Sequence, residues 1–328
     1  MTAGRKFFLV GALGAIAAGA LSAQPMRGRR GLPPPDWPGN ANESSGSGHY
    51  VWIEQGGMVD EDTVRTARET ASHSSGTPEW TNPPGFEKDV FTFARVIFPT
   101  ARAPGDRWNY GGRLGWWVDY PDADLNFSYR LQTLTSTRVD PDARVLKLTD
   151  PSLTDYPLIY MEHIESMRLP DQQVDILRRY LLNGGALLIN DIWNIHAWQN
   201  LEAEMKRVLP ERGWVELAPE HPMFHCVFDL RGTMKDWQVP TLQFWNRDYD
   251  PRDPNSTLQW RDRGPGSEDM HVRAWLDDKG RPSVLVIYNS DVSDGWEREG
   301  ENSDYFHRFS EKISYPLGIN LVFYLMTH

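Results

Sequence analysis

The hydrophobic pattern changes near residue 91, where apolar runs begin to alternate with amphipathic segments. Runs typical of buried strands cover residues 91–98, 144–148, 158–161, 186–189, 272–276 and 283–288. Segments with helical spacing or helical end signals cover residues 124–135, 170–184, 196–208 and 305–326. Strands that alternate with helices predict an α/β fold, in which a mostly parallel sheet is covered by helices on both faces.

Local signals mark the ends of the first two of these helices. The helix near residue 124 has apolar side chains on one face, and Asp122 or Asp124 stands where an N-terminal cap is expected. In the next helix, Pro170 occupies the first turn and Gly184 marks the end. Before the domain, a shorter helix is predicted over residues 60–71.

The first 23 residues have the pattern of an export signal. A basic pair, Arg5 and Lys6, precedes an apolar run from Phe7 to Ala23 that ends in small residues. A cleaved signal peptide and a retained membrane anchor both fit, because this run is at the lower limit of what spans a bilayer. In either case the folded part is predicted to be periplasmic or on the exported face, and a retained anchor would hold it at the membrane.

Composition divides the chain into three regions. Residues 1–23 form the leader or anchor, and residues 24–90 form an extended linker arm rich in Pro, Gly and Ser, with the short helix inside it. Residues 91–328 form the α/β domain. Within that domain, residues 232–269 are rich in Asp, Arg, Pro and Trp, and are predicted to be a long insertion.

Charge and cysteine content narrow the class of protein. The net charge of −11 over 328 residues argues against binding to nucleic acid through general electrostatics. Cys226 is the only cysteine, so no intramolecular disulfide can form and packing must hold the fold together. No glycine pattern fits a phosphate loop or a dinucleotide site, and we predict no cofactor.

The densest candidate site begins with the segment Gly-Trp-Trp-Val-Asp-Tyr-Pro-Asp at residues 115–122. In open α/β sheets ligands bind beyond the carboxyl ends of the strands, and three of the four loops predicted there carry carboxylates beside tryptophan. The resulting aromatic-acidic edge consists of Trp116, Trp117, Asp119, Tyr120, Asp122, Asp191, Trp193, Asp294, Trp296 and Glu297. Aromatic rings flanked by carboxylates are typical of a recognition surface or an active-site wall.

Three carboxylates on these loops are candidates for catalysis. Asp119, Asp191 and Asp291 follow different predicted strands, so their loops open on the same edge of the sheet. Carboxylates in such a position act as acid and base or hold a metal ion. The structural alternative is that these aspartates cap the helices that follow the strands.

Histidines offer a different metal site. His221 and His225 stand four residues apart, and His163 or His196 would complete their ligand set. Pro222 argues against a regular helix that would place the first two histidines on one face. The alternative is that these histidines bond to the backbone within a turn.

Several short sequence motifs are similar to those of one bacterial family. They include Trp-Asn-Tyr-Gly-Gly at 108–112, Gly-Trp-Trp-Val-Asp-Tyr-Pro-Asp-Ala-Asp at 115–124 and Asp-Gly-Trp-Glu at 294–297. Over residues 91–328 the chain closely resembles the family of domain of unknown function 4159. That family brings no established activity.

The wider resemblance is to the class I glutamine amidotransferase-like fold, and especially to its trehalose-utilisation branch, which implies a flavodoxin-like sheet. True amidotransferases carry a nucleophilic cysteine where this chain has Asn190 and Asp191. Their histidine base follows a late strand, where this chain has Asn289, Ser290 and Asp291. The resemblance therefore implies a degenerate site without cysteine-dependent glutaminase activity.

Two classes of function remain open. In the first, a non-catalytic accessory subunit uses the aromatic-acidic edge to dock a protein partner in a larger membrane-associated complex. In the second, an exported hydrolase uses Asp119, Asp191 and Asp291, with or without a bound metal, on a carbohydrate-like substrate that stacks on tryptophan. The first is preferred at this point because the nucleophile and the base of the fold are both missing.

Overall fold

A computed structural model of the chain describes residues 50–53, 57–72, 74, 76–85, 89–100, 115–248, 250, 252 and 263–328. The predicted leader at residues 1–23 lies outside this part of the chain, as does the beginning of the predicted arm. The described residues all belong to one compact unit, Glu43–His328.

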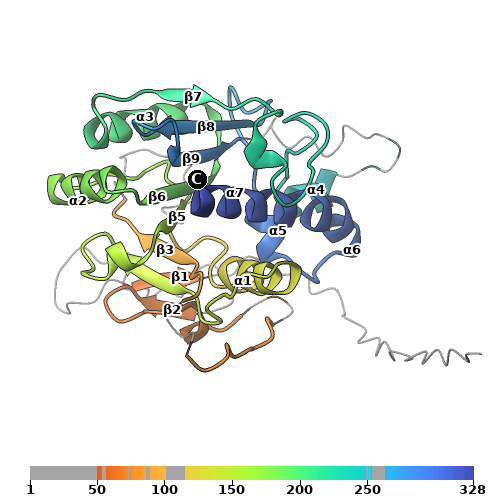
Figure 1. The fold of residues 1–328 in the computed structure, drawn as a ribbon. Helices are drawn as coiled ribbons and strands as arrows, with labels where there is room; N and C mark the ends of the chain where they lie inside the picture. The colour runs from red at the N-terminus through yellow and green to blue at the C-terminus, as the bar shows by residue number, and fades with distance from the viewer. Residues whose placement is uncertain are drawn as a thin grey trace, which may run out of the picture. The chain divides into compact units, whose positions relative to one another are not determined.

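A seven-stranded sheet forms the centre of this unit (Figure 1). Its strands are β3 (Ala94–Ile97), β4 (Arg144–Lys147), β5 (Leu158–Glu162), β6 (Ala186–Ile192), β7 (Trp214–Glu216), β8 (His271–Leu276) and β9 (Pro282–Tyr288). They lie in the order β4-β3-β5-β6-β9-β8-β7. The first five in this order are parallel, whereas β8 and β7 are antiparallel to their neighbours. The predicted mostly parallel sheet is confirmed, and β7 is a strand that the pattern did not indicate.

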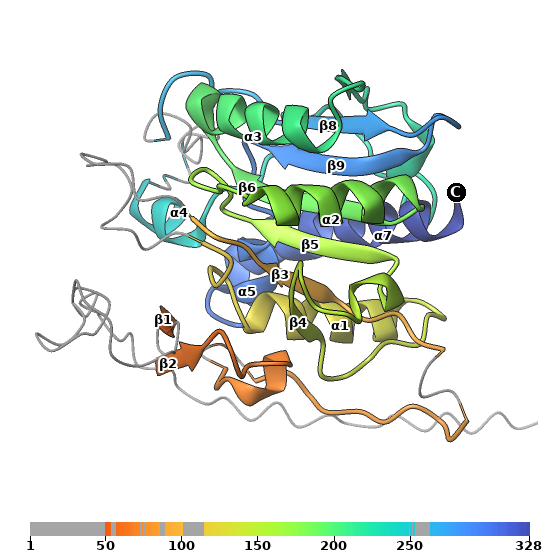
Figure 2. The same ribbon diagram turned by 90° about the vertical axis from the view of Figure 1, so that its left-hand side faces the viewer.

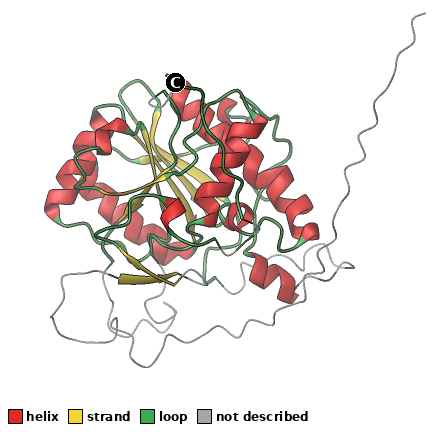
Figure 3. Cartoon of the chain, turned by 90° about the horizontal axis from the view of Figure 1, so that it is seen from below, coloured by secondary structure: helices red, strands yellow, loops and turns green. Residues whose placement is uncertain are grey.

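Helices cover both faces of the sheet (Figures 2 and 3). Helices α2 (Asp171–Leu182) and α3 (Asn194–Val208) lie on one face. Helices α1 (Asp122–Leu134), α5 (Asp294–Glu297) and α7 (Tyr315–Thr327) lie on the other, where α7 contacts β5. Every residue of β5, β6 and β9 is buried, as expected for strands between two helical layers.

The strand order identifies the edge where a ligand site is expected. The chain leaves β3 for β4 on one side, then returns past β3 to β5 and continues to β6 and β9. This is the 2-1-3-4-5 order of doubly wound folds, whose ligands bind beyond the carboxyl ends of the strands where the order reverses. The loops that follow β3, β5, β6 and β9 therefore lie at the edge where a ligand is expected to bind.

The segment before the domain is packed against it. Strands β1 (Tyr50–Ile53) and β2 (Gly57–Asp60) pair antiparallel, and a short 3-10 helix follows at Ala67–Glu69. The helix predicted over residues 60–71 is therefore wrong, because a turn follows β2 and only its last part winds into a helix. Ile53 and Ala67 are buried in the core, so this part of the predicted arm is not a free linker.

The last third of the chain also departs from its predicted form. In place of one helix over residues 305–326 there are α6 (Ser303–Tyr305), a π-helical segment Phe306–Ser314, and α7. Pro316 stands in the first turn of α7, where its missing N–H matters least. The predicted insertion contains the short helix α4 (Leu242–Asp248). Across the described residues, none of the helices has the length and apolar character required to cross a bilayer.

Candidate functional site

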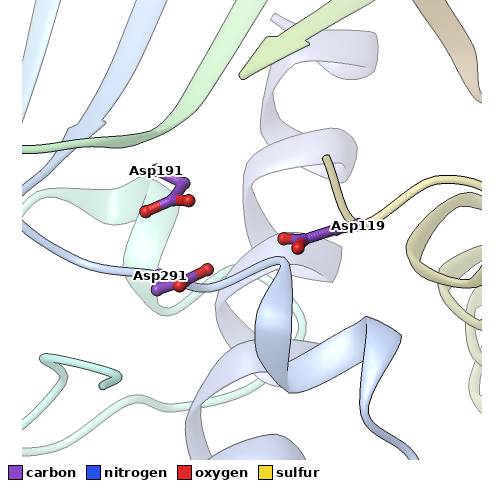
Figure 4. A group of neighbouring side chains, drawn as sticks. All are labelled: Asp119, Asp191 and Asp291. Atoms are coloured by element: carbon purple, nitrogen blue, oxygen red, sulfur yellow. The ribbon is translucent and has the colours of Figure 1, made fainter. Parts of the chain in front are cut away.

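Three aspartates that are far apart in the sequence meet at the carboxyl edge of the sheet. Asp119 lies in the loop before α1, Asp191 near the end of β6 and Asp291 after β9. Figure 4 shows their carboxylates turned toward one another. One oxygen from each lies within 4.8 Å of the other two, and all three side chains are buried. The structure thus brings together the three carboxylates that the sequence suggested as catalytic.

Unusual backbone geometry accompanies this convergence. Asp119, His163, Asp191 and Asn289 have φ values of 58°, 50°, 49° and 61°, in the left-handed region that non-glycine residues seldom adopt. In β6 the pairing with β9 is irregular between Ile189 and Ile192, which is where Asp191 lies. Such conformations persist only where the surroundings enforce them, and they concentrate at functional sites.

Asp191 is held by two donors. Its carboxylate forms a buried ion pair with Nε2 of His163, and the indole N–H of Trp193 donates to its Oδ1 atom. Although burial alone would raise the pKa of Asp191, the charge and hydrogen bond of His163 override it and lower this pKa. In His163, burial acts to lower the pKa, but the carboxylates of Asp191 and Glu165 raise it well above its usual value. Both pKa shifts favour an imidazolium paired with a carboxylate.

Asp291 has weaker compensation. Thr241 donates its hydroxyl to Oδ2, the backbone N–H of Asp294 donates to Oδ1 at 3.1 Å, and Arg263 Nη2 lies 3.6 Å from Oδ2. Burial, followed by the negative charges of Asp191 and Asp294, raises the pKa of Asp291 well above its usual value. The ionised form of Asp291 is thus disfavoured unless a further positive charge is present.

Asp119 is the least compensated of the three. Its side chain is buried, with 8% exposed, and Oδ2 has no hydrogen-bond partner among the described residues. Burial raises the pKa of Asp119 well above its usual value, and the charges of Glu297 and Glu162 add to this effect. A buried carboxylate oxygen without a partner is costly, so this atom requires a proton or a cation.

A second acidic group shares Asp119. Oxygens of Asp119, Asp294 and Glu297 also lie within 4.8 Å of one another. In this group one arginine contacts two carboxylates, since Arg298 Nε lies 2.6 Å from Oε2 of Glu297 and 3.3 Å from Oδ1 of Asp294. Burial raises the pKa of Glu297 well above its usual value although Arg298 opposes the shift.

Arg95 fixes the loop that carries Asp119. This fully buried side chain on β3 donates to both oxygens of Asp124 at 2.9 Å and forms an ion pair with Glu162. It also donates to the backbone oxygens of Trp116 at 2.8 Å and Val118 at 3.1 Å. Because one guanidinium holds the loop, α1 and the end of β5, it determines where Asp119 stands.

The two predicted cap residues of α1 have other partners. Asp124 is bound to Arg95, and Asp122 accepts hydrogen bonds from Ser72 and Ser74. The N-cap position itself is Pro121, and no side-chain cap is formed there. Neither predicted residue therefore caps α1, whereas Asp291 does act as a cap, because its Oδ1 atom accepts from the backbone N–H of Asp294, the first residue of α5.

Charge at the centre does not balance within the described chain. Five buried acidic side chains meet there: Asp119, Asp191, Asp291, Asp294 and Glu297. Three cationic side chains pair with members of the group: His163, Arg263 and Arg298. If all five are ionised, the three cationic groups leave a negative surplus, and two of these groups, His163 and Arg298, also pair with Glu165 and Glu301. Oxygens that share a divalent cation at about 2.1–2.4 Å lie up to about 4.8 Å apart, in agreement with the spacing found here.

The aromatic-acidic edge is internal, contrary to its prediction as an exposed surface. Trp116, Tyr120 and Trp296 are 0% exposed and Trp193 is 2% exposed, so these rings cannot reach a protein partner. Of the predicted tryptophans, Trp117 is partly exposed. The acidic members Asp122, Asp294 and Glu297 are buried as well. These side chains are buried because the loops that carry them pack against one another.

Individual contacts account for two of the buried rings. Phe127 and Trp296 pack with their centroids 4.6 Å apart in the core beneath α1. Arg263 lies over the ring of Trp193, with its guanidinium carbon 4.8 Å from the centroid. That face of Trp193 is therefore occupied by an arginine of the same chain.

His221 and His225 bond to the backbone within a turn, as the alternative to a histidine metal site predicted. His221 Nδ1 accepts a hydrogen bond from the backbone N–H of Met223, and His225 pairs with Asp229 and with the Pro219 carbonyl. In the part of the chain that the structure describes, no group of three clustered ligands contains a histidine. His163 does reach the centre, but as the partner of Asp191.

Sequence reasoning missed the arginines of this site. Arg95, Arg263 and Arg298 come from a strand, the insertion and the turn after α5, and no spacing relates them. One indication of Arg298 as a site residue was present in the sequence, because it directly follows the motif Asp-Gly-Trp-Glu at residues 294–297. Which carboxylate each arginine meets is decided by the packing of distant loops.

Comparison with known proteins supports the family and leaves the activity open. No curated protein matches the chain. A family model matches residues 107–326, which include all five carboxylates of the centre. The wider amidotransferase-like resemblance stays a prediction. The chain belongs to the family described as domain of unknown function (DUF4159).

Proposed function

We propose that this domain is a divalent-cation-dependent hydrolase, with Asp119, Asp191 and Asp291 as the ligands of the cation. The observation that carries the proposal is the convergence of three buried carboxylates, one of which has an oxygen without a partner in the described chain. The donors are all carboxylate oxygens, which hard cations such as Mg²⁺, Mn²⁺ and Ca²⁺ prefer. The location also agrees, because doubly wound folds bind ligands at this edge.

The chemistry follows from placing a cation among these groups. A cation held by Asp119, Asp191 and Asp291 would make a bound water lose a proton more readily and so supply a nucleophile at neutral pH. Attack by that water would form a bond from its oxygen to the electrophilic centre of the substrate and break the bond to the leaving group, which would take up the proton that the water gives up. The carboxylates of Asp191 and Glu165 raise the pKa of His163, which is the nearest described proton donor to Asp191.

The accessory-subunit hypothesis finds less support at this site. Its docking edge was to consist of exposed rings, and four of those rings are buried. The carbohydrate-like substrate rested on the same rings, so hydrolysis is proposed here without a sugar substrate. Export belongs to the proposal as an expectation, because the leader pattern falls outside the described residues. Fractionation of the native host would test it.

Cation binding is the direct test. Isothermal titration with Mn²⁺ and Ca²⁺ should show binding to the wild-type protein and at least a tenfold loss of affinity in Asp191→Asn. Asp278→Asn is the matched control, because this aspartate is 94% exposed and pairs with Arg212 away from the centre. Turnover of ester and phosphate substrates should then require the cation. Absence of both binding and turnover in the wild-type protein would refute the proposal.

A further inference from the structure

Two acidic groups at the centre share one carboxylate. The first group consists of Asp119, Asp191 and Asp291. The second consists of Asp119, Asp294 and Glu297. Each set has its oxygens within 4.8 Å of one another. A carboxylate common to two such sets is the arrangement that bridges the ions of a two-metal centre.

The two groups differ in their resident positive charge. In the set with Asp294 and Glu297, Arg298 is 9% exposed at its side chain, and its Nε atom contacts both carboxylates, at 3.3 Å and 2.6 Å. In the other set, each cationic group contacts a single carboxylate: His163 pairs with Asp191, and Arg263 lies 3.6 Å from Asp291. Arg298 is therefore the cationic group that contacts two carboxylates of one set, as a metal ion would, whereas no described cationic group does so in the set of Asp119, Asp191 and Asp291.

Repulsion between like charges agrees with this distinction. A second divalent ion would add two positive charges beside a buried guanidinium, and like charges in a buried site repel strongly. Arg298 and a second cation therefore compete for the same carboxylates.

We propose that Arg298 takes the place of a second cation, so that the centre holds one divalent ion and Asp119 is a terminal ligand and not a bridge. The inference rests on the proposed function, because it assumes that a cation binds at Asp119, Asp191 and Asp291. Arg298 thus decides between one-metal and two-metal chemistry at this site. Its removal opens a second position for a hard divalent cation at Asp119, Asp294 and Glu297.

The stoichiometry of bound Mn²⁺ tests the inference. After equilibration and removal of free ion, metal analysis of the full chain should find one Mn²⁺ in the wild-type protein and two in Arg298→Ala. The two ions of the variant should couple magnetically in electron paramagnetic resonance, because they share Asp119. The double variant Arg298→Ala/Glu297→Gln should return to one ion, since the second set then lacks a charged ligand.

Arg178→Ala is the matched control, because Arg178 pairs with Glu211 away from the centre and its loss should leave one ion. Two ions in the wild-type protein, or one ion in a folded Arg298→Ala, would overturn the inference while the proposed function stands. No ion in the wild-type protein would remove both. If Arg298→Ala does not fold in Mn²⁺, the wild-type count still decides, since two ions are incompatible with a resident Arg298.

Discussion

At the scale of single residues, the centre is defined by unequal compensation of buried charge. Asp191 is paired with His163, and Glu297 with Arg298. Asp119 lacks such a partner for its Oδ2 atom within the described chain. Because an isolated buried charge is unfavourable, Asp119 is the residue whose replacement separates cation binding from folding most clearly.

Replacement of Asp119 by Asn should stabilise the cation-free protein and abolish cation binding. The amide removes a buried charge and keeps the shape of the side chain. In the presence of a chelator we expect a gain of about 1 kcal/mol, or roughly 2–4 °C in the midpoint of thermal unfolding. Calorimetry with and without Ca²⁺ measures both effects. A variant that is less stable than the wild type in chelator would contradict this account of Asp119.

The stability of the cation-free protein should depend on pH through Asp119 and Asp291. Burial raises the pKa of both carboxyls above the unfolded value of about 3.9. The folded state then binds more protons than the unfolded state, so this contribution is complete below about pH 4 and is lost as pH rises through the folded pKa values.

The measurement compares wild-type protein with Asp119→Asn in chelator between about pH 4 and pH 8, a range that starts at the unfolded pKa. The advantage of the variant should grow with rising pH, because only the wild type loses the protonated form of Asp119. Saturating Ca²⁺ should remove this trend, since the cation takes the place of the protons. An advantage that stays constant with pH would show that Asp119 does not titrate differently in the folded state.

At the scale of elements, the site depends on how four loops are held at one edge of the sheet. Arg95 connects β3, α1, the end of β5 and the loop with Asp119 through buried hydrogen bonds. The regular parts of these elements were predictable, because central strands are continuous apolar runs and α1 has one apolar face. Their loops were not, since Asp119, His163 and Asp191 adopt left-handed conformations that no local propensity favours.

Replacement of Arg95 by Met should be severe. It leaves Asp124 and Glu162 buried without their counter-ion, which costs about 3–5 kcal/mol when one partner of a buried pair is removed. Urea unfolding measures the loss. The triple variant Arg95→Met/Asp124→Asn/Glu162→Gln, which removes the charges together, should recover part of the stability but not the cation affinity, because the loop of Asp119 stays released. Full recovery of affinity would show that Arg95 does not position Asp119.

At the scale of the whole molecule, the domain extends beyond its predicted start at residue 91. Val51, Ile53, Val59, Val64 and Ala67 are buried with the main core. The backbone N–H of Ala67 donates to Asp142 at 3.0 Å, and that of Val145 donates to Arg65 at 2.8 Å. A composition rich in Pro, Gly and Ser indicated a linker, but a few apolar side chains were enough to attach the segment to the domain.

Two truncations test this boundary. A chain that starts at residue 43 should keep the stability of the full chain, because the compact unit begins at Glu43. A chain that starts at residue 91 loses five buried apolar side chains and should be less stable by several kcal/mol, at about 1.5 kcal/mol or more for each large aliphatic side chain. Thermal unfolding compares them. Equal midpoints would show that residues 50–85 contribute no packing energy.

Local patterns along the chain were enough to predict the layers of the fold and the family. Apolar runs, helical spacing and end signals are local, so they predicted the α/β sheet with helices on both faces. The sequence motifs shared with the family are also short and continuous, so they can be recognised without the fold. Asp119, Asp191 and Asp291 were also found, because they follow strands whose carboxyl ends meet at one edge.

The surroundings of those carboxylates could not be predicted, because they depend on how distant loops pack in the fold. Side chains from separate loops buried the tryptophans that composition suggested were exposed, and paired Arg298 with Glu297 and Asp294. The same packing of loops leaves one oxygen of Asp119 without a partner in the described chain. The burial of a side chain and the compensation of its charge depend on neighbours that are distant in sequence and meet only in the fold. They therefore cannot be predicted from a pattern along the chain.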